Sequence, residues 1–133
     1  MLVSTRSVSK VAERRQLGQW GERYAAQMLV GKGYQLLAQN WRCPAGEMDL
    51  IMQDGDALVF VEVKTRRGGW PGSPESALTE AKVTRLFAIV EHYLLQHDLS
   101  EECEWRVDAV AVELAADGTL RRCQHWPALS LDG

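Results

Sequence analysis

A carboxylate and an ammonium group, Glu62 and Lys64, stand two positions apart near the end of the otherwise apolar segment 57–65. In a β-strand they would point to the same face, about 6.6 Å apart at ~3.3 Å per residue. A strand that is apolar on both faces is covered on both sides, and an unpaired charge there costs free energy. The pair therefore indicates a site for a charged ligand, and the alternative is a solvent-exposed strand end with a weak ion pair.

A third acidic side chain, Asp49, is brought to this pair by the Asp54-Gly55 turn, whose sequence is a strong signal for a β-hairpin. If these two residues form the loop, Asp49 lies opposite Phe60 and shares a face with Glu62, about 7–8 Å away along the diagonal. A four-residue loop would place Asp49 directly opposite Glu62, with the same result. A three-residue loop would place the two carboxylates on opposite faces.

Glu22 belongs to a helix expected over residues 11–30, where apolar side chains recur at helical spacing. On a helix, Gly18, Glu22 and Ala25 lie on the same side, next to the stripe of apolar side chains. Glu22 is therefore expected at the edge of the buried face. Together with Gly21, the small residues Gly18 and Ala25 would let the helix approach the sheet closely. Glu22 is therefore a fourth candidate for the same site.

Hard oxygen ligands of this kind suit Mg²⁺ or Mn²⁺, and Mg²⁺ often uses only one or two carboxylates. Asp49 and Glu62, with the backbone carbonyl of Val63, are the predicted metal ligands. A bound cation would polarise a phosphate group and lower the pKa of a coordinated water. Lys64 would orient that water and stabilise negative charge on the phosphate, while Glu22 would hold a metal-bound water or a second metal.

Periodicity and turn residues predict the remaining elements and hence the fold class. The expected order is helix, three strands, helix, two strands, which gives an α/β domain with a central mixed five-stranded sheet flanked by helices. Residues 1–10 are polar and basic and are expected to form a mobile tail before a single domain over residues 11–133. The predicted helices cover residues 11–30 and 79–97, and the predicted strands cover residues 34–41, 47–52, 57–65, 105–113 and 120–126.

Charge is distributed unevenly along the chain, although the net charge is only −3. Residues 1–85 carry 12 basic and 9 acidic side chains, whereas residues 86–133 carry 3 and 9. A phosphate backbone responds to the local charge and not to the total, so the basic first part is compatible with nucleic acid.

Other classes of protein are disfavoured by composition. The three cysteines have no C-x-x-C spacing, which argues against a zinc site and a disulfide framework. The three histidines, His125 among them, lack metal-site spacing and are expected to be surface or partly packed residues. No apolar run approaches the roughly 20 residues that span a bilayer, and no signal-peptide core is present. We therefore expect a cytoplasmic protein without a membrane partner.

Four segments carry a resemblance to a known family. They are Gly21-Glu22, Gly46-Glu47-Met48-Asp49-Leu50-Ile51, Phe60-Val61-Glu62-Val63-Lys64-Thr65-Arg66 and Arg106-Val107-Asp108. In this order they resemble the YraN family of bacterial proteins. That family is similar to archaeal Holliday-junction resolvases of the restriction-endonuclease-like, or PD-(D/E)xK, superfamily. The resemblance covers residues 13–113.

The resemblance implies a restriction-endonuclease-like core in which Glu22, Asp49, Glu62 and Lys64 form the catalytic set. It also implies an endonuclease that hydrolyses phosphodiester bonds in DNA, including branched, Holliday-junction-like DNA, with Mg²⁺ or Mn²⁺. Cleavage of a junction needs two symmetric cuts, so a homodimer is expected with that substrate. Met48 departs from the superfamily motif, which often has proline there, but proline is not a metal ligand.

Further contacts to nucleic acid are hypothesised from basic and aromatic residues near the predicted site. Arg66 and Arg67 follow the strand that carries Glu62, and they either contact phosphate or belong to a plain exposed loop. Lys82 opens the second helix and would either reach a phosphate or lie in solvent over apolar surface. Trp70 would stack on a base or wedge into a junction, or else anchor its loop by packing.

Some alternatives remain open. Glu47 either lies near the cation or caps the strand entrance, and Arg106 and Asp108 are interpreted as a structural ion pair. Two other functions are considered: a non-catalytic nucleic-acid-binding module that retains the nuclease fold, and a protein-interaction domain that uses the acidic C-terminal part. A binding module would keep salt-sensitive DNA affinity without Glu62 and would not cleave DNA. An interaction domain would show neither DNA affinity nor cleavage.

Overall fold

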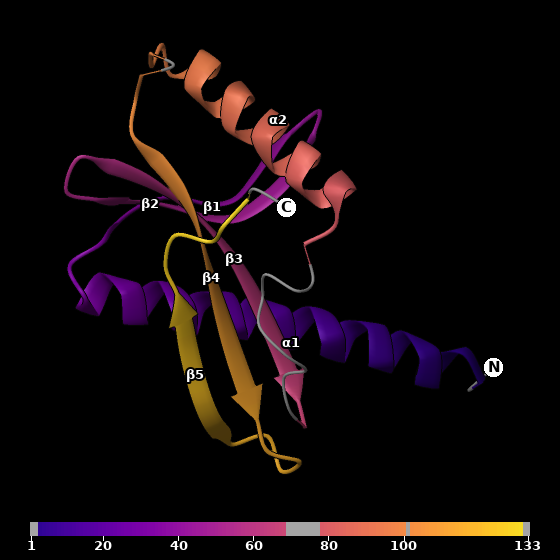
Figure 1. Ribbon diagram of the computed structural model, residues 1–133. Coiled ribbons are helices and arrows are strands. Elements are labelled where there is room, and N and C mark those ends of the chain that lie inside the picture. Colours follow the sequence, from indigo (N-terminus) through magenta and orange to yellow (C-terminus); the bar gives the residue numbers. More distant parts are fainter. Residues whose placement is uncertain (1–2, 69–77, 101, 132–133) are drawn as a thin grey trace.

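The computed structural model describes residues 3–68, 78–100 and 102–131, with side chains from residue 12 onwards (Figure 1). Two helices and five strands follow the predicted order, which confirms the α/β class and fits a nuclease-like core. The elements are α1 (Val3–Gly31), β1 (Gln35–Cys43), β2 (Gly46–Asp54), β3 (Ala57–Arg67), α2 (Glu80–Gln96), β4 (Trp105–Leu114) and β5 (Leu120–Trp126).

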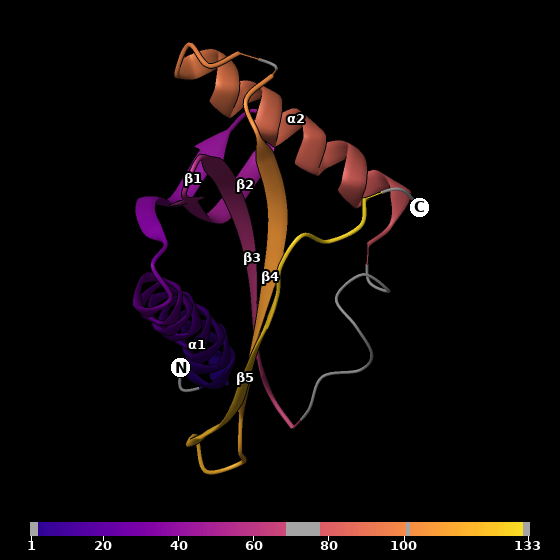
Figure 2. The ribbon, with the colours of Figure 1, turned by 60° about the vertical axis from the view of Figure 1, so that its left-hand side comes forward.

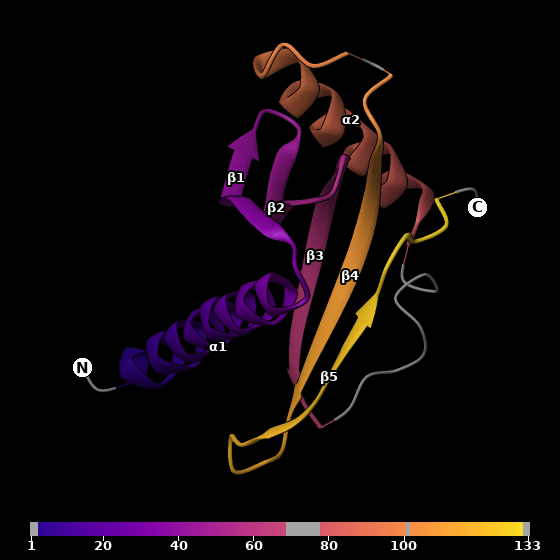
Figure 3. The same ribbon diagram turned by 90° about the vertical axis from the view of Figure 1, so that its left-hand side faces the viewer.

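Helix α1 begins at Val3, eight positions before the start that periodicity indicated. Residues 3–10 are therefore part of the helix and not a separate tail. They carry no apolar stripe, and hence no periodic signal, but no glycine or proline precedes Gly18 to end a helix. The amino-terminal half of α1 extends beyond the sheet (Figure 3). Neither described helix is long and apolar enough to cross a membrane.

The five strands form one mixed sheet in the order β1-β2-β3-β4-β5, in which β3 and β4 run parallel. Helices α1 and α2 cover opposite faces of this sheet (Figure 2). The apolar side chains of β3 alternate between the two faces, as strand geometry requires. Phe60 packs in a cluster with Ile89 and Tyr93 of α2, whereas Val61 packs in a cluster with Leu29 of α1.

The hairpin between β2 and β3 has a different loop from the one predicted at Asp54-Gly55. Asp54 still belongs to β2 and pairs with Ala57, so the loop consists of Gly55 and Asp56. Gly55 has a φ of 59°, and glycine at the first of two loop positions is the pattern of a type II′ turn. The prediction was therefore wrong by one position in the loop, because glycine can occupy either loop position in a hairpin.

This shift changes the partner of Asp49 but not the face of the sheet on which it was predicted. Leu50 pairs with Val61, and the same register continued by one residue sets Asp49 opposite Glu62 and not opposite Phe60. The observed register is the one expected from a four-residue loop. Because the two registers differ by two residues, the strand alternation is preserved.

Candidate active site

Strands β2 and β3 separate at the predicted site. Their pairing ends at Leu50 and Val61, whereas β3 continues to Arg67 with β4 as its partner on the other side. Residues 62–67 therefore have one side that pairs with no strand among the described residues. This side is the open edge of β3.

Asp49 lies at the point where the two strands part. Its Oδ2 atom accepts a hydrogen bond of 2.8 Å from the backbone N–H of Val63. The carboxylate thus takes the place that a strand carbonyl would occupy in a continued ladder. The N–H and C=O groups of one strand residue point to the same edge, so the Val63 carbonyl also faces the open edge.

Asn40 supports this geometry from β1, and sequence reasoning did not single it out. The ladder pairs on either side of it place Asn40 opposite Asp49. Its φ of 49° lies in the left-handed region, which asparagine adopts more readily than most residues. Its side chain forms a hydrogen bond with Glu22. The only sequence signal was an asparagine inside a predicted strand, where asparagine is depleted.

Glu22 reaches the site because α1 packs closely on β3. A Cβ atom at Gly21 would overlap the Thr65 hydroxyl and lie 2.9 Å from Thr65 Cβ, so a side chain there would push the helix away. Gly18 has open space instead. Glu22 Oε2 is buried and has no hydrogen-bond partner in the part of the chain described. A buried carboxylate oxygen in this state is suited to a cation or a hydrogen-bond donor.

Neighbouring carboxylates and burial act together on Glu22. Burial is the largest cause that raises its pKa, followed by the nearby charge of Asp49. The hydrogen bond with Asn40 lowers the pKa, and the charge of Glu47 raises it further. The net effect is a pKa above the ordinary value, which means that negative charge here is only partly compensated.

Burial and neighbouring carboxylates also raise the pKa of Asp49. Burial raises its pKa to about 6, against the hydrogen bond from the Val63 N–H, which lowers it. The charge of Glu62 raises this pKa and the charge of Lys64 lowers it, while Glu47 raises it as well. Asp49 is therefore within electrostatic reach of each of these side chains.

These donors fit a hard divalent cation of the Mg²⁺ type. No group of three or more His, Cys, Asp and Glu side chains within the described ranges is arranged to hold a metal by itself. Mg²⁺ needs only one or two carboxylates, because water and substrate oxygens complete its shell. Asp49, the Val63 carbonyl and the unpartnered oxygen of Glu22 are oxygen donors of this class, and Glu62 lies nearby.

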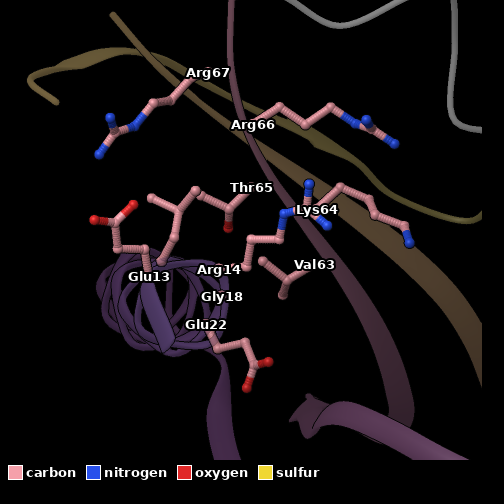
Figure 4. Close-up of a pocket in the computed structure, with 10 residues that line it drawn as sticks. Glu13, Arg14, Gly18, Glu22, Val63, Lys64, Thr65, Arg66 and Arg67 are labelled. Carbon is pink, nitrogen blue, oxygen red and sulfur yellow. The ribbon is translucent and has the colours of Figure 1, made fainter. Parts of the chain in front are cut away.

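A cavity of about 940 Å³ lies between α1 and the open edge of β3 (Figure 4). Of the residues predicted for the site, five line it: Glu22, Val63, Lys64, Arg66 and Arg67. Asp49 and Glu62 do not line it, but Asp49 adjoins it through its bond to Val63. Figure 4 shows the Lys64 side chain directed away from α1 and the Glu22 carboxylate directed past Val63. This cavity forms the cleft between α1 and β3.

The remaining residues singled out from the sequence are Lys82, Trp70 and Glu47. Lys82 is on α2, across the sheet from α1, and does not line the cleft. Its backbone N–H donates to the hydroxyl of Thr79, the N-cap of α2. Trp70 lies outside the described residues. The Glu47 carboxylate lies 3.4 Å from Arg42 Nε at the entrance to β2, and its charge raises the pKa of Asp49.

The predicted ion pair of Arg106 and Asp108 is confirmed at 3.0 Å. Asp108 is completely buried, and it accepts further hydrogen bonds from His125 Nε2 at 2.8 Å and from the Ala128 N–H at 2.9 Å. Burial would raise the pKa of Asp108, but these donors and Arg106 hold it below its ordinary value. His125 is thus partly packed, as predicted, and serves a structural network.

The three cysteines are free thiols, also as predicted.

Comparison with known proteins places the chain in a family. Residues 21–112 match the family model described as "Uncharacterised protein family UPF0102". A UPF0102 protein of Roseiflexus castenholzii is 43% identical over 86% of this chain and 92% of its own length. UPF0102 proteins of Herpetosiphon aurantiacus and Symbiobacterium thermophilum are 40% and 49% identical, over 90% and 80% of this chain and 98% and 90% of their own lengths. The chain therefore belongs to the uncharacterised protein family UPF0102, the YraN family to which its motifs pointed.

Proposed function

We propose that this protein is a Mg²⁺-dependent endodeoxyribonuclease that hydrolyses phosphodiester bonds in DNA. The observation that carries the proposal is the half-buried Asp49 carboxylate at the separation of β2 and β3, bonded to the Val63 N–H. Beside it lie Glu22, with an unpartnered buried oxygen, and Lys64, within electrostatic reach. This arrangement combines oxygen donors for a cation with a positive group for a phosphate.

Asp49, Glu62 and the Val63 carbonyl are the residues that would hold the cation, with Glu22 as a further oxygen donor. When bound, Mg²⁺ or Mn²⁺ would supply a Lewis acid next to the scissile phosphate. Asp49 is held in place by the Val63 N–H, so little reorganisation is needed before binding. The raised pKa values of Asp49 and Glu22 indicate negative charge that a cation would stabilise.

Lys64 would act on the phosphate and on the attacking water. Its side chain is exposed at the open edge, so the ammonium can turn towards a substrate without first leaving a buried position. An ammonium there would stabilise the negative charge that builds up on the phosphate oxygens and would hold the water in line with the bond that breaks. The acidic and basic groups thus have separate roles.

The resemblance to archaeal Holliday-junction resolvases supports branched DNA as the substrate and a homodimer as the active form, because a junction needs two symmetric cuts. The alternative is a nucleic-acid-binding module that keeps the fold without cleaving. The two differ in one measurable respect, which is phosphodiester cleavage that depends on Glu62 and Lys64.

The test is cleavage of labelled four-way-junction and linear duplex DNA with Mg²⁺ or Mn²⁺. The wild-type protein, Glu62→Ala and Lys64→Ala are compared with Glu91→Ala, a control that removes an exposed carboxylate from α2. We expect each site variant to lose about 10²-fold or more in rate, as on removal of one transition-state contact. The control should cleave like the wild type.

Two outcomes would overturn the proposal. Equal cleavage by the wild type and both site variants would identify a contaminating nuclease. Absence of cleavage by the wild type with either metal, together with salt-sensitive DNA binding that survives in Glu62→Ala, would establish the binding module instead.

A further inference from the structure

The cleft between α1 and β3 is longer than a metal site requires. Its α1 wall runs from Glu13 and Arg14 to Glu22. Arg14 and Glu22 are eight positions apart, which is about 12 Å along the helix at ~1.5 Å per residue. Gly18 lies between them, and no atom comes within 4 Å of the place where its Cβ would be. The wall therefore leaves open space between the end with Glu13 and Arg14 and the end with Glu22.

The β3 wall offers hydrogen-bonding groups along the same direction. Leu58 N–H donates to Glu104 O next to β4, so the even-numbered residues of β3 turn their N–H groups towards β4. The N–H groups of Thr65 and Arg67 therefore face the open edge, beyond the Val63 N–H that Asp49 accepts. Thr65 Oγ1, at the packing contact with α1, is buried without a partner in the described structure.

The charges along the cleft change from acidic to basic. Glu22 lies at the end next to Asp49, whereas the guanidinium of Arg67 points to the side of the cleft where Glu13 lies (Figure 4). Arg14 comes from the opposite wall. Arginine binds phosphate oxygens with a planar array of donors, and such contacts fix the register of a nucleic-acid strand.

We propose that this cleft holds the sugar–phosphate backbone of a DNA strand, with Arg14 and Arg67 as phosphate-binding residues that position the strand. The inference rests on the proposed nuclease function and adds a substrate path to it. One phosphate lies at the Glu22 end, where cleavage occurs. Arg14 binds a phosphate further along the same strand, beyond the one at the Glu22 end.

Arg15 provides a matched control for Arg14. It is the next residue of the same helix, it is exposed, and it does not line the cleft. Arg121 on β5 is exposed as well and serves as the control for Arg67. In each pair, both variants lose one arginine from the same kind of element, but only one of the two arginines lines the cleft. The comparison therefore separates a general loss of positive charge from the loss of a contact in the cleft.

The experiment measures the affinity for a fluorescent DNA duplex by anisotropy in EDTA, over a series of salt concentrations. We expect Arg14→Ala and Arg67→Ala to bind about tenfold more weakly, as on loss of one charged hydrogen bond. The slope of log affinity against log salt should fall by about one in each variant. Arg15→Ala and Arg121→Ala should stay within about twofold of the wild type, and circular dichroism checks that every variant is folded.

Neutral methylphosphonate linkages then locate the contact. Placed singly along one strand, they should weaken binding by the wild type at one phosphate to the side of the cleaved bond. A methylphosphonate at that one position should not change the affinity of Arg14→Ala for the DNA. At every other position it should affect the variant as it affects the wild type. This loss of position-specific sensitivity is not expected from a variant that is only less stable.

The cleft proposal and the nuclease proposal fail in different ways. If Glu62→Ala abolishes cleavage but Arg14→Ala and Arg67→Ala bind DNA like their controls, the substrate path is wrong and the nuclease stands. If both arginine variants lose affinity while the wild type never cleaves, the nuclease is wrong and the cleft is a nucleic-acid-binding site. If the wild type neither binds DNA nor cleaves it with either metal, both are overturned.

Discussion

Asp49 Oδ2 and the backbone N–H of Val63 form a hydrogen bond of 2.8 Å across the gap where β2 leaves β3. This bond orients the carboxylate and ends the β2–β3 ladder on a charged group. It does not fully offset burial, which raises the pKa of Asp49 to about 6. The site therefore holds negative charge that the metal-free protein stabilises poorly.

Asp49→Asn should stabilise the metal-free protein at neutral pH. The folded-state pKa is raised to about 6 from 3.8, so ionisation of Asp49 destabilises the fold increasingly as pH rises between these values. Asparagine keeps an oxygen acceptor for the Val63 N–H and removes the charge. The free energy of unfolding in urea with EDTA should rise by roughly 1–3 kcal/mol at pH 7.5, at ~1.4 kcal/mol per pKa unit.

The advantage of Asp49→Asn should shrink as pH falls towards 4, where the wild-type carboxylate is protonated in the folded protein. The same variant should lose cleavage activity. A variant that is less stable than the wild type at pH 7.5 would contradict the argument from burial.

Metal binding should release protons in a pH-dependent way. A carboxylate must be deprotonated to bind Mn²⁺, and Asp49 is largely protonated below its pKa of about 6. Calorimetric titration with Mn²⁺ at pH 5.5 should therefore show release of most of one proton, and titration at pH 7.5 should show release of far less. Affinity should rise with pH and level off above about pH 7. A binding constant independent of pH would contradict metal binding through a carboxylate whose pKa is raised by burial.

Two glycines of α1 should respond in opposite ways to alanine. Gly21→Ala would overlap Thr65 and force α1 from β3, at a cost of about 1–3 kcal/mol for overpacking. Gly18→Ala meets open space and removes a flexible residue from a helix interior, so it should stabilise by roughly 0.5–1 kcal/mol. Urea unfolding of both variants measures the contrast. Equal effects of the same sign would mean that α1 does not pack on β3 through Gly21.

Asp108→Asn should be the most destabilising of these changes. The carboxylate is buried and compensates Arg106, and breaking a buried pair by removing one partner costs about 3–5 kcal/mol. Its pKa is held below the ordinary value, so its stabilisation is present above about pH 4 and is lost only on further acidification. Urea unfolding at pH 7 checks this, with Asp56→Asn in the exposed hairpin loop as the control. A small effect at Asp108 would show that the network is solvated.

The sequence by itself determined the residues whose spacing is set within one element. Glu62 and Lys64 stand two apart on a strand, so their shared direction follows from alternation alone. Asp49 shares the face of Glu62 both in the register with Phe60 as its partner and in the observed one, since these differ by two residues. The strand over residues 120–126 was predicted with its observed limits for the same local reason. Helix α1 was not, because the polar residues 3–10 give no periodic signal.

Only the tertiary structure decided which distant segments meet at the site. The hydrogen bond between Asn40 and Glu22 joins β1 to α1, and Arg14 lies on the wall of the cleft because α1 packs on β3. The position of the loop at Gly55 was also known only from the structure. The burial that raises the pKa of Asp49 also depends on contacts between distant segments. Local alternation and helical periodicity fix the direction of a side chain, but burial and neighbouring charge come from packing between elements far apart in the chain. That packing turns separate carboxylates into one candidate site.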